Sequence, residues 1–449
     1  MKTEKKVFYK KLTALVFPIA VQNLMTALVS ASDALMLGFL DQTALSAVSL
    51  ATQVQFVLNL FFTALTIGAT VLAAQYWGKQ DIDSVEEVLC IALKISFLIS
   101  FLFFMTAFSF PRILMQIFTN ELLLIEAGIP YLRIVSWSYL FMGFSQIYLC
   151  IMKNSGRTTK STIYGSLAVI LNILLNAILI FGLFGFGQMG IAGAALATTL
   201  SRAVELLLTI FENAKTGVVR VRLRYFHSVR LKRDYYRYTM PVLANELVWG
   251  CGFTMFSVIM GHLGSDAVAA NSVANIAKNI IACVCLGIGT GSGILVGNEL
   301  GSGNLESARK YGKMLCRVSL ITGAVSGLFI LMSSPMILMF TTSLTEQAHT
   351  YLQMMLYICS YYMIGKSINS TVVAGIFCAG GDTKFGFICD AITMWLIIIP
   401  LGAIAAFILQ LPVLTVYFLL NLDELVKLPA VYRHYKQYKW VKNLTTNQQ

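Results

Sequence analysis

The sequence predicts an all-α integral membrane protein with twelve transmembrane helices in two six-helix lobes. Composition is the first observation, because 57% of the 449 residues are apolar and only 12% are charged, with a mean hydropathy of +0.74. A soluble domain carries about 25% charged residues. The second observation is that apolar runs of roughly 20 residues, the length that crosses a bilayer, recur along the whole chain. The third is that the second half of the chain repeats features of the first.

The expected spans number twelve, six in each half of the chain. In the first half they lie at about 12–38, 50–76, 88–109, 123–151, 161–184 and 191–213. In the second half they lie at about 236–262, 272–298, 313–333, 346–377, 386–408 and 412–431. The basic segment at the start precedes an apolar run that is too long for a cleaved signal peptide, so we expect the first helix to be retained.

Positive charges gather between the predicted spans. Lys and Arg number 33 against 21 Asp and Glu, which gives a net charge of +12. They concentrate in the N-terminal tail, at 153–160, in a loop at about 215–237 and in a C-terminal tail that starts at Lys427. Because cytoplasmic loops of membrane proteins are rich in Lys and Arg, we predict a multi-pass protein of the cell inner (cytoplasmic) membrane with both termini cytoplasmic. No folded basic domain is left over, so we expect no nucleic-acid partner.

The two halves match at a constant offset of 223 positions. Pro18 corresponds to Pro241 at this offset, and Gly38 corresponds to Gly261. Further matched pairs are Gly68 with Gly291, Gln75 with the similar Asn298, and Gly78 with Gly301. We therefore predict an N-lobe at 1–214, a basic cytoplasmic linker at 215–235 and a C-lobe at 236–449. Six spans return the chain to the same side, so the lobes should be related by a pseudo-twofold axis along the membrane normal, with a cleft between them that suits alternating access.

Three further patterns predict packing rather than chemistry. Glycines alternate from Gly287 to Gly293, but without the ending of a phosphate-binding loop, so we expect them to allow close helix contact. Arg202 and Glu205 are three positions apart on one predicted span and should pair with each other. The nine cysteines stand mostly alone and the four histidines are scattered, so the sequence predicts no metal cluster, no cofactor and no catalytic constellation.

Several motifs occur in a fixed order along nearly the whole chain. They are Pro18 with Asp33, Ala74-Gln75-Tyr76-Trp77-Gly78, Asn172-Ile-Leu-Leu-Asn176, the glycine- and alanine-rich segment from Gly190, Pro241-Val-Leu-Ala-Asn-Glu246, and Gly380-Gly381-Asp382-Thr383-Lys384 with Trp395 and Pro400. Together they resemble the bacterial multidrug and toxic compound extrusion (MATE) transporters. The resemblance implies an antiporter, not an enzyme, that is driven by H⁺ or Na⁺ and exports organic, often cationic, compounds through the central cleft.

The resemblance also places the coupling residues. In the N-lobe it assigns cation coupling to Asp33, supported by Asn172 and Asn176, although relatives often carry an acid where Asn176 stands. In the C-lobe it gives Glu246 a cation-binding role, although Lys366 stands where some relatives carry an Asp. No metal ion is expected beyond Na⁺ at Asp33 or Glu246, as the alternative to H⁺.

Each candidate residue also has a structural explanation. A carboxylate inside a bilayer normally faces a bundle interior or a cavity, so Asp33 either couples transport or is a structural acid bonded to nearby hydroxyls. Glu246 either binds the cation or forms a buried ion pair with Lys366. The predicted substrate cleft is lined by Asp33, Met36, Glu246, Trp249, Phe256, Lys278 and Lys366. For the apolar members ordinary packing is the alternative, and for Lys278 it is snorkelling to the membrane surface.

Two other functions stay open at this point. Lys278 and Lys366 would suit the strongly cationic cleft of a lipid or polysaccharide-precursor flippase of the wider superfamily. A membrane-embedded lipid enzyme is the weaker alternative, because no cluster of His, Asp and Ser supports it. As partners we expect small organic molecules and the lipid bilayer, and we expect a monomer.

Overall fold

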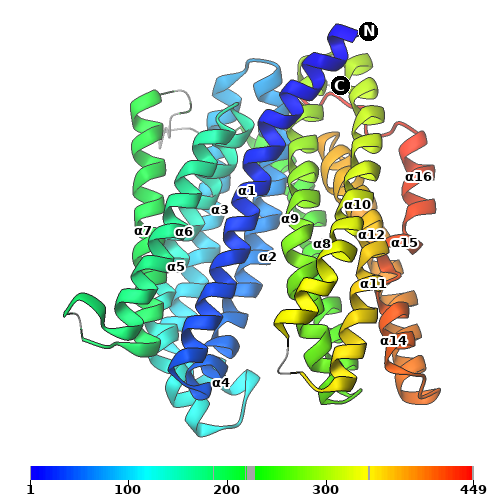
Figure 1. The fold of residues 1–449 in the computed structure, drawn as a ribbon. Helices are drawn as coiled ribbons and strands as arrows, with labels where there is room; N and C mark the ends of the chain where they lie inside the picture. Colours follow the sequence, from blue (N-terminus) through cyan, green and yellow to red (C-terminus); the bar gives the residue numbers. More distant parts are fainter. Residues whose placement is uncertain (1, 186, 218, 220–227, 342–343, 447–449) are drawn as a thin grey trace. The chain divides into compact units, whose positions relative to one another are not determined.

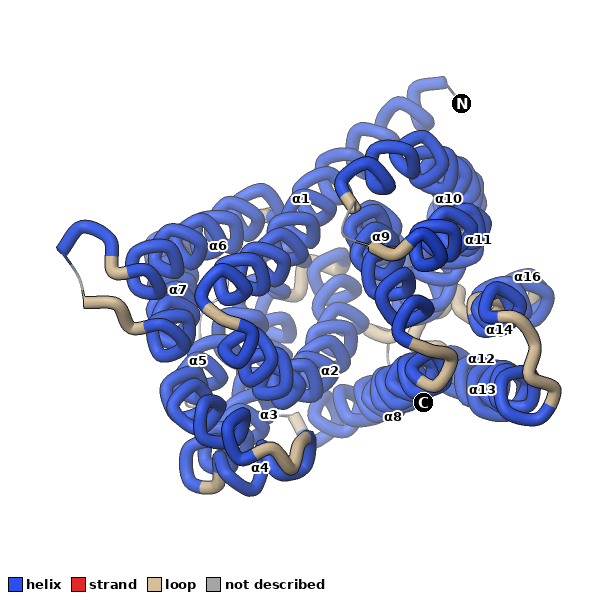
Figure 2. The backbone as a smooth tube through the Cα atoms, turned by 60° about the horizontal axis from the view of Figure 1, so that its bottom comes forward, coloured by secondary structure: helices blue, strands red, loops and turns tan. Residues whose placement is uncertain are grey.

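A computed structural model describes residues 2–185, 187–217, 219, 228–341 and 344–446 (Figure 1). Within these residues the chain is built from helices joined by short loops, and it contains no strand (Figure 2). The all-α fold that the composition predicts is therefore confirmed.

The helices of the first half follow the predicted spans closely. They are α1 (Lys2–Leu40), α2 (Gln42–Gly78), α3 (Ile82–Ser109), α4 (Pro111–Phe118), α5 (Leu122–Asn154), α6 (Thr158–Phe181), the short 3₁₀ segment η1 (Leu183–Gly185) and α7 (Gly190–Thr216). The short helix α4 was not among the predicted elements. It begins with a proline at its first position, where the missing N–H costs nothing.

The second half begins with four long helices and then becomes less regular. The long helices are α8 (Val229–Gly261), α9 (Ser265–Gly301), α10 (Leu305–Phe340) and α11 (Glu346–Asn369). The remaining elements are η2 (Ser370–Phe377), α12 (Thr383–Asp390), η3 (Ala391–Ile398), α13 (Ile399–Ala403), η4 (Ile404–Ile408), α14 (Val413–Leu420), α15 (Asp423–Val426) and α16 (Leu428–Lys436). The segments η2, η3 and η4 are π-helical and continue their neighbouring α-helices.

Ten helical segments in the described part of the chain are long and apolar enough to cross a membrane. The tenth and twelfth predicted spans are not among them. The tenth is α11 with η2, whose α-helical part carries many polar side chains. The twelfth is broken after α14, because the helix turns at Asn421 and Leu422 before a run of charged residues.

The internal repeat is confirmed in the helix bounds. α2 spans Gln42–Gly78 and α9 spans Ser265–Gly301, so both bounds differ by the 223 positions that separate Pro18 from Pro241. The two prolines lie inside the long helices α1 and α8. The next helices, α3 and α10, begin at Ile82 and Leu305, again at the same offset.

The chain divides into two compact units. We call Met1–Asn23, Ala74–Gln80 and Arg237–Gln449 the C-unit, and Leu24–Ala73 with Asp81–Tyr236 the N-unit. Helices α1 and α2 therefore contribute residues to both units. The predicted lobe limits at 1–214 and 236–449 stay predictions, and residues 218 and 220–227 of the predicted linker lie outside the described residues.

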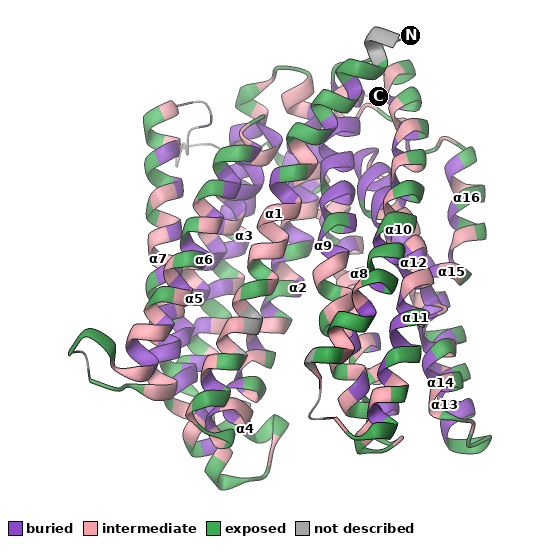
Figure 3. Cartoon of the chain, viewed as in Figure 1, coloured by how far each residue is buried: buried purple, intermediate pink, exposed green. Residues whose placement is uncertain are grey.

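Helix α9 forms the centre of the C-unit. Of its most apolar stretch, 78% of the residues are buried, compared with 22% for α8 (Figure 3). A Cβ atom at Gly289 would lie 2.7 Å from the carbonyl oxygen of Ser370, and one at Gly287 would lie 3.1 Å from Ala20. These glycines let neighbouring backbones approach α9 closely, which confirms the packing role predicted for the run.

The matched ends of α2 and α9 contact each other reciprocally within the C-unit. Gly78 packs against the backbone of Asn298, and Gly301 packs against the backbone of Gln75. Gly78 and Gly301 are matched positions of the repeat, and the residues that they contact, Asn298 and Gln75, are matched positions as well. Such paired contacts are the signature of a local twofold axis between these two helix ends.

The C-terminal segment is fastened to the end of α2. Gln75 is fully buried, and its amide nitrogen donates to the carbonyls of Ala379, at 2.6 Å, and Lys442, at 3.1 Å. Its amide oxygen accepts a bond of 2.6 Å from the backbone N–H of Leu444. The fully buried Trp440 packs against Gly380 and Gly312. We call residues 440–445 the C-terminal strap.

Candidate ion and substrate sites

The predicted site residues fall into two sets, one in each unit. Asp33, Met36, Asn172 and Asn176 belong to the N-unit, and Glu246, Trp249, Phe256, Lys278 and Lys366 belong to the C-unit. Each set is described within its own unit.

Asp33 of α1 is bonded to the two asparagines of α6. The amide nitrogen of Asn176 donates a hydrogen bond of 2.5 Å to the Asp33 carboxylate. The same nitrogen lies 3.1 Å from the amide oxygen of Asn172. Because the asparagines are four positions apart, they lie one turn above each other on one face of α6. The predicted amide support for Asp33 is therefore present in the structure.

The polar chain continues from α6 to α7. The amide nitrogen of Asn172 donates to the hydroxyls of Thr198, at 3.3 Å, and Ser201, at 3.4 Å. Asn172 and Asn176 are almost completely buried, whereas Asp33 is half-buried. The carboxylate is thus the accessible end of a buried row of polar groups.

One acceptor in this row has no partner among the described residues. The buried amide oxygen of Asn176 accepts no hydrogen bond, although its nitrogen is fully used. A buried polar atom without a partner is uncommon and calls for an explanation. Together with the Asp33 carboxylate it offers oxygen ligands or a proton acceptor at one place, which suits a small hard cation or a proton.

Arg202 and Glu205 of α7 form the predicted pair. Their side chains are 2.9 Å apart, and the hydroxyl of Ser145 donates to the same Glu205 oxygen at 3.2 Å. Glu205 is almost fully buried, so the pair neutralises a carboxylate that would otherwise be costly in this position.

In the C-unit, Glu246 does not pair with Lys366. The Lys366 ammonium lies 3.3 Å from the Glu424 carboxylate and 5.5 Å from the centre of the Trp249 ring. Glu246 is half-buried on α8 and forms no hydrogen bond or ion pair with any residue that the structure describes. It interacts with Lys366 and Asp390 only through longer-range electrostatics. Of the two alternatives for Glu246, the ion pair with Lys366 is therefore wrong, because Lys366 pairs with Glu424.

Glu424 belongs to a buried charged cluster that was not predicted from the sequence. Asn369 donates to the backbone and carboxylate oxygens of Glu424, both at 2.7 Å. The Lys427 ammonium lies 2.8 Å from Asp390, 3.3 Å from Glu424 and 4.0 Å from Asp423. We call Lys366, Asn369, Asp390, Asp423, Glu424 and Lys427 the charged cluster. Buried charges of this kind are tolerated because they are paired and hydrogen-bonded.

The cluster corrects the predicted C-terminal tail. Lys427 was expected to open a basic cytoplasmic tail, but its side chain is only 6% exposed and is held by three carboxylates. The available signal was the spacing of Asp423, Glu424 and Lys427, three and four positions apart in an apolar setting. Two π-helical segments start directly after cluster residues, η2 after Asn369 and η3 after Asp390. Such segments are frequent at functional sites.

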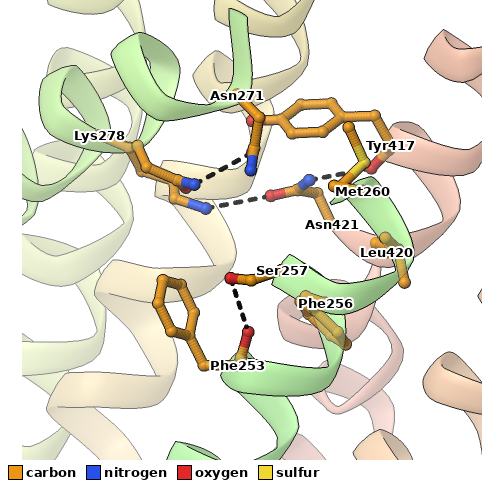
Figure 4. A pocket seen from close by; sticks show the side chains of 10 residues that line it. Phe253, Phe256, Ser257, Met260, Asn271, Lys278, Tyr417, Leu420 and Asn421 are labelled. Atoms are coloured by element: carbon orange, nitrogen blue, oxygen red, sulfur yellow. Dashed lines mark hydrogen bonds between the residues drawn. The ribbon is translucent and has the colours of Figure 1, made fainter. Parts of the chain in front are cut away.

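A small hollow, partly open to solvent, lies between α8, α9 and α14 in the C-unit (Figure 4). It is lined by Phe253, Phe256, Ser257, Met260, Asn271, Asn275, Lys278, Tyr417, Leu420 and Asn421. We call it the Lys278 pocket. Two residues of the predicted cleft, Phe256 and Lys278, line it. Lys366 instead belongs to the charged cluster, and Trp249 lies beside Lys366.

The described residues contain no group of three or more His, Cys, Asp or Glu side chains placed to hold a metal ion. Na⁺ at Asp33 or at Glu246 stays a prediction.

Long apolar helices with isolated acids, amides and paired charges between them define the class of the protein as a membrane transporter. The MatE family model matches residues 18–178 and 241–404, and the chain belongs to this family. The predicted resemblance is therefore confirmed, and the family is one of transporters rather than enzymes.

Full-length relatives support the same assignment. The chain is 24% identical over 436 residues to the uncharacterized transporter YisQ of Bacillus subtilis, covering 96% of this chain and 94% of that protein. It is 26% identical over 437 residues to the probable multidrug resistance protein NorM of Thermotoga maritima, covering 96% and 93%. A solved MOP superfamily transporter from Pyrococcus furiosus, whose binding pocket is described as having reverse polarity that suggests a different function, matches with a TM-score of 0.87 at 18% identity and covers 96% of this chain and 95% of that one. At that identity the likeness shows the fold.

Proposed function

We propose that the protein exports organic compounds in exchange for H⁺ or Na⁺, with Asp33 as the main coupling residue. The observation that carries this proposal is the hydrogen bond of 2.5 Å from Asn176 to the half-buried Asp33 carboxylate. A named multidrug resistance relative supports organic compounds as the transported class.

The Asp33–Asn176 pair can respond to a bound cation in a simple way. The ionised carboxylate accepts a hydrogen bond from the Asn176 nitrogen. A protonated carboxyl becomes a donor, and the partnerless Asn176 oxygen is an acceptor on the same amide. Na⁺ would instead use the carboxylate and amide oxygens directly. Either event changes the hydrogen bonds between α1 and α6, and such a change can bias two conformations of the transporter.

The surroundings of Glu246 in the C-unit are the reason why we propose Asp33, and not Glu246, as the main coupling residue. Glu246 lacks a polar partner, while the neighbouring carboxylates are held by the ammonium groups of Lys366 and Lys427. The same pairing weakens the flippase alternative, because Lys366 is neutralised by Glu424 and does not add a free positive charge. We propose Glu246 as a secondary cation or substrate contact.

The proposal is tested by dye transport in proteoliposomes with a pH gradient and a Na⁺ gradient imposed separately. We expect a cationic dye to be transported by wild-type protein under one of the gradients. Asp33→Asn should abolish the response to that gradient, and Glu246→Gln should reduce it by a smaller factor. Leu174→Ala is the matched control, because Leu174 is an exposed neighbour on α6.

Two results would contradict the proposal. Transport that ignores both gradients would exclude ion-coupled exchange. Full gradient-driven transport by Asp33→Asn would remove Asp33 from the coupling site while leaving the exporter class intact.

A further inference from the structure

Lys278 differs from the other lysines inside the C-unit. Lys366 and Lys427 each lie within 3.3 Å of at least one carboxylate. Lys278 has no carboxylate within 4 Å among the described residues, and Asp423 interacts with it only at longer range. Its ammonium contacts the amide oxygen of Asn421 at 3.3 Å and lies 4.6 Å from the centre of the Tyr362 ring. The positive charge is therefore held by neutral groups.

The rest of the pocket adds neutral polar groups and no acid. Asn271, Asn275 and Lys278 are four and three positions apart and share one face of α9, and Figure 4 shows the labelled pair Asn271 and Lys278 side by side. Asn275 donates to the Asn271 oxygen at 3.0 Å, which fixes the amides and leaves N–H groups of Asn271 for another partner. None of the ten lining residues is Asp or Glu. The only formal charge in the pocket lining is thus positive.

The opposite walls are apolar. Phe253, Phe256 and Met260 come from α8, and Tyr417 with Leu420 comes from α14. Aromatic rings and methionine give a large, adaptable contact surface for a flat organic molecule. Pockets that bind small molecules combine such walls with a few convergent polar groups.

We propose that the Lys278 pocket binds the carboxylate of an aromatic organic acid or zwitterion, so that anionic groups are part of the substrate range. The carboxylate would take a charge-assisted hydrogen bond from Lys278 and a second from the Asn271 amide, while the ring lies between Phe253 and Phe256. A purely cationic compound would be repelled here. That such acids are transported rests on the proposed exporter function. That they bind in the Lys278 pocket does not depend on it.

Binding to purified protein in detergent tests the proposal without any transport step. The probes are dansylglycine, its neutral amide and the cationic dansylcadaverine, which share one fluorescent ring system and differ in charge. We expect wild-type protein to bind dansylglycine about tenfold more tightly than the amide, and the cation more weakly than either. A single good charge-assisted contact is worth about 1.4 kcal/mol or more, which corresponds to this factor.

Three variants distinguish the effect of the Lys278 charge on binding from an effect on folding. Lys278→Met should abolish the preference for dansylglycine over the amide, and Lys278→Arg should retain it. Asn421→Asp should also abolish it, because it places a carboxylate beside an intact Lys278. Melting temperatures show whether each variant folds, and the amide probe reports the intact apolar walls.

Equal affinity of wild type for the acid and its amide would overturn the proposal, as would a preference that survives in both Lys278→Met and Asn421→Asp. A lipid phosphate is the other source of an anionic group. Displacement of dansylglycine by short-chain phosphatidylglycerol but not by benzoate would overturn the assignment to organic acids. If ion-driven dye transport fails while the acid preference holds, the coupling proposal is wrong and the pocket assignment stands.

Discussion

The Lys366 ammonium is paired with Glu424, 58 positions away along the chain, at a distance of 3.3 Å. This pairing separates the acids of the C-unit into those that are paired with lysines and those that are not. Glu424 is committed to Lys366, Lys427 and Asn369, whereas Glu246 has no polar partner among the described residues. A carboxylate whose charge is already matched is a poor site for an external cation, so the cluster is expected to act in stability and Glu246 to stay accessible to ligands.

Glu424→Leu should destabilise the protein more than Lys366→Met. The first change leaves Lys366 without an acid and removes one partner of Lys427, and breaking a buried pair in this way costs about 3–5 kcal/mol. After the second change Glu424 keeps Lys427 and Asn369. Thermal melting of the detergent-solubilised protein measures the order of the two variants.

Lys310→Met is the control for this comparison, because it removes the exposed Lys310–Glu306 pair. Exposed pairs contribute about 0–1 kcal/mol, so little change is expected. A melting temperature of Glu424→Leu equal to that of the control would show that the charged cluster does not stabilise the fold.

Asn176→Ala should slow ion-driven transport about tenfold while leaving the fold intact. The change removes the hydrogen bond to Asp33, and a bond to a charged group contributes about 1.5–3 kcal/mol. Initial dye transport rates in proteoliposomes give the measurement, with Leu174→Ala on the same helix as control. Equal rates for the two variants, at equal amounts of inserted protein, would mean that Asn176 does not support Asp33.

Gly301→Ala should be strongly destabilising, and Gly293→Ala should be nearly neutral. A Cβ at Gly301 overlaps the backbone of Gln75, which cannot move without shifting a helix, whereas one at Gly293 stays 3.6 Å from the nearest atom. Overpacking of this kind costs typically about 1–3 kcal/mol or more. The two variants differ by one methyl group each on the same helix, so equal melting temperatures would contradict the close contact between α2 and α9.

Gln75→Leu should loosen the C-terminal strap. The variant leaves the N–H of Leu444 and the carbonyls of Ala379 and Lys442 without their side-chain partner. Each buried group left without a partner costs about 1–3 kcal/mol. Limited proteolysis should therefore cut the last residues of the variant faster than those of wild type.

Gln437→Ala serves as the control for the strap, since Gln437 is exposed on the segment that leads into it. Proteolysis at the same rate in both variants would indicate that Trp440, rather than Gln75, holds the strap in place.

The sequence alone determined the class of the protein and its internal repeat. Hydrophobic length and the offset of 223 positions are properties of the chain itself, and the bounds of α2 and α9 follow them. The spacing of four puts Asn172 and Asn176 on one face of α6. That this face lies beside Asp33 was implied by the family resemblance and not by the spacing.

Only the tertiary structure decided the partners of the buried charges. Periodicity tells which residues share a helix face, but it does not tell which faces of distant helices meet. Glu424 and Lys427 stand beyond a break in the last predicted span, so local pattern assigned Lys427 to the tail. In the folded chain the low dielectric of the interior favours pairs of opposite buried charges, and Lys366 and Lys427 are paired with acids in this way. Lys278 instead has neutral neighbours.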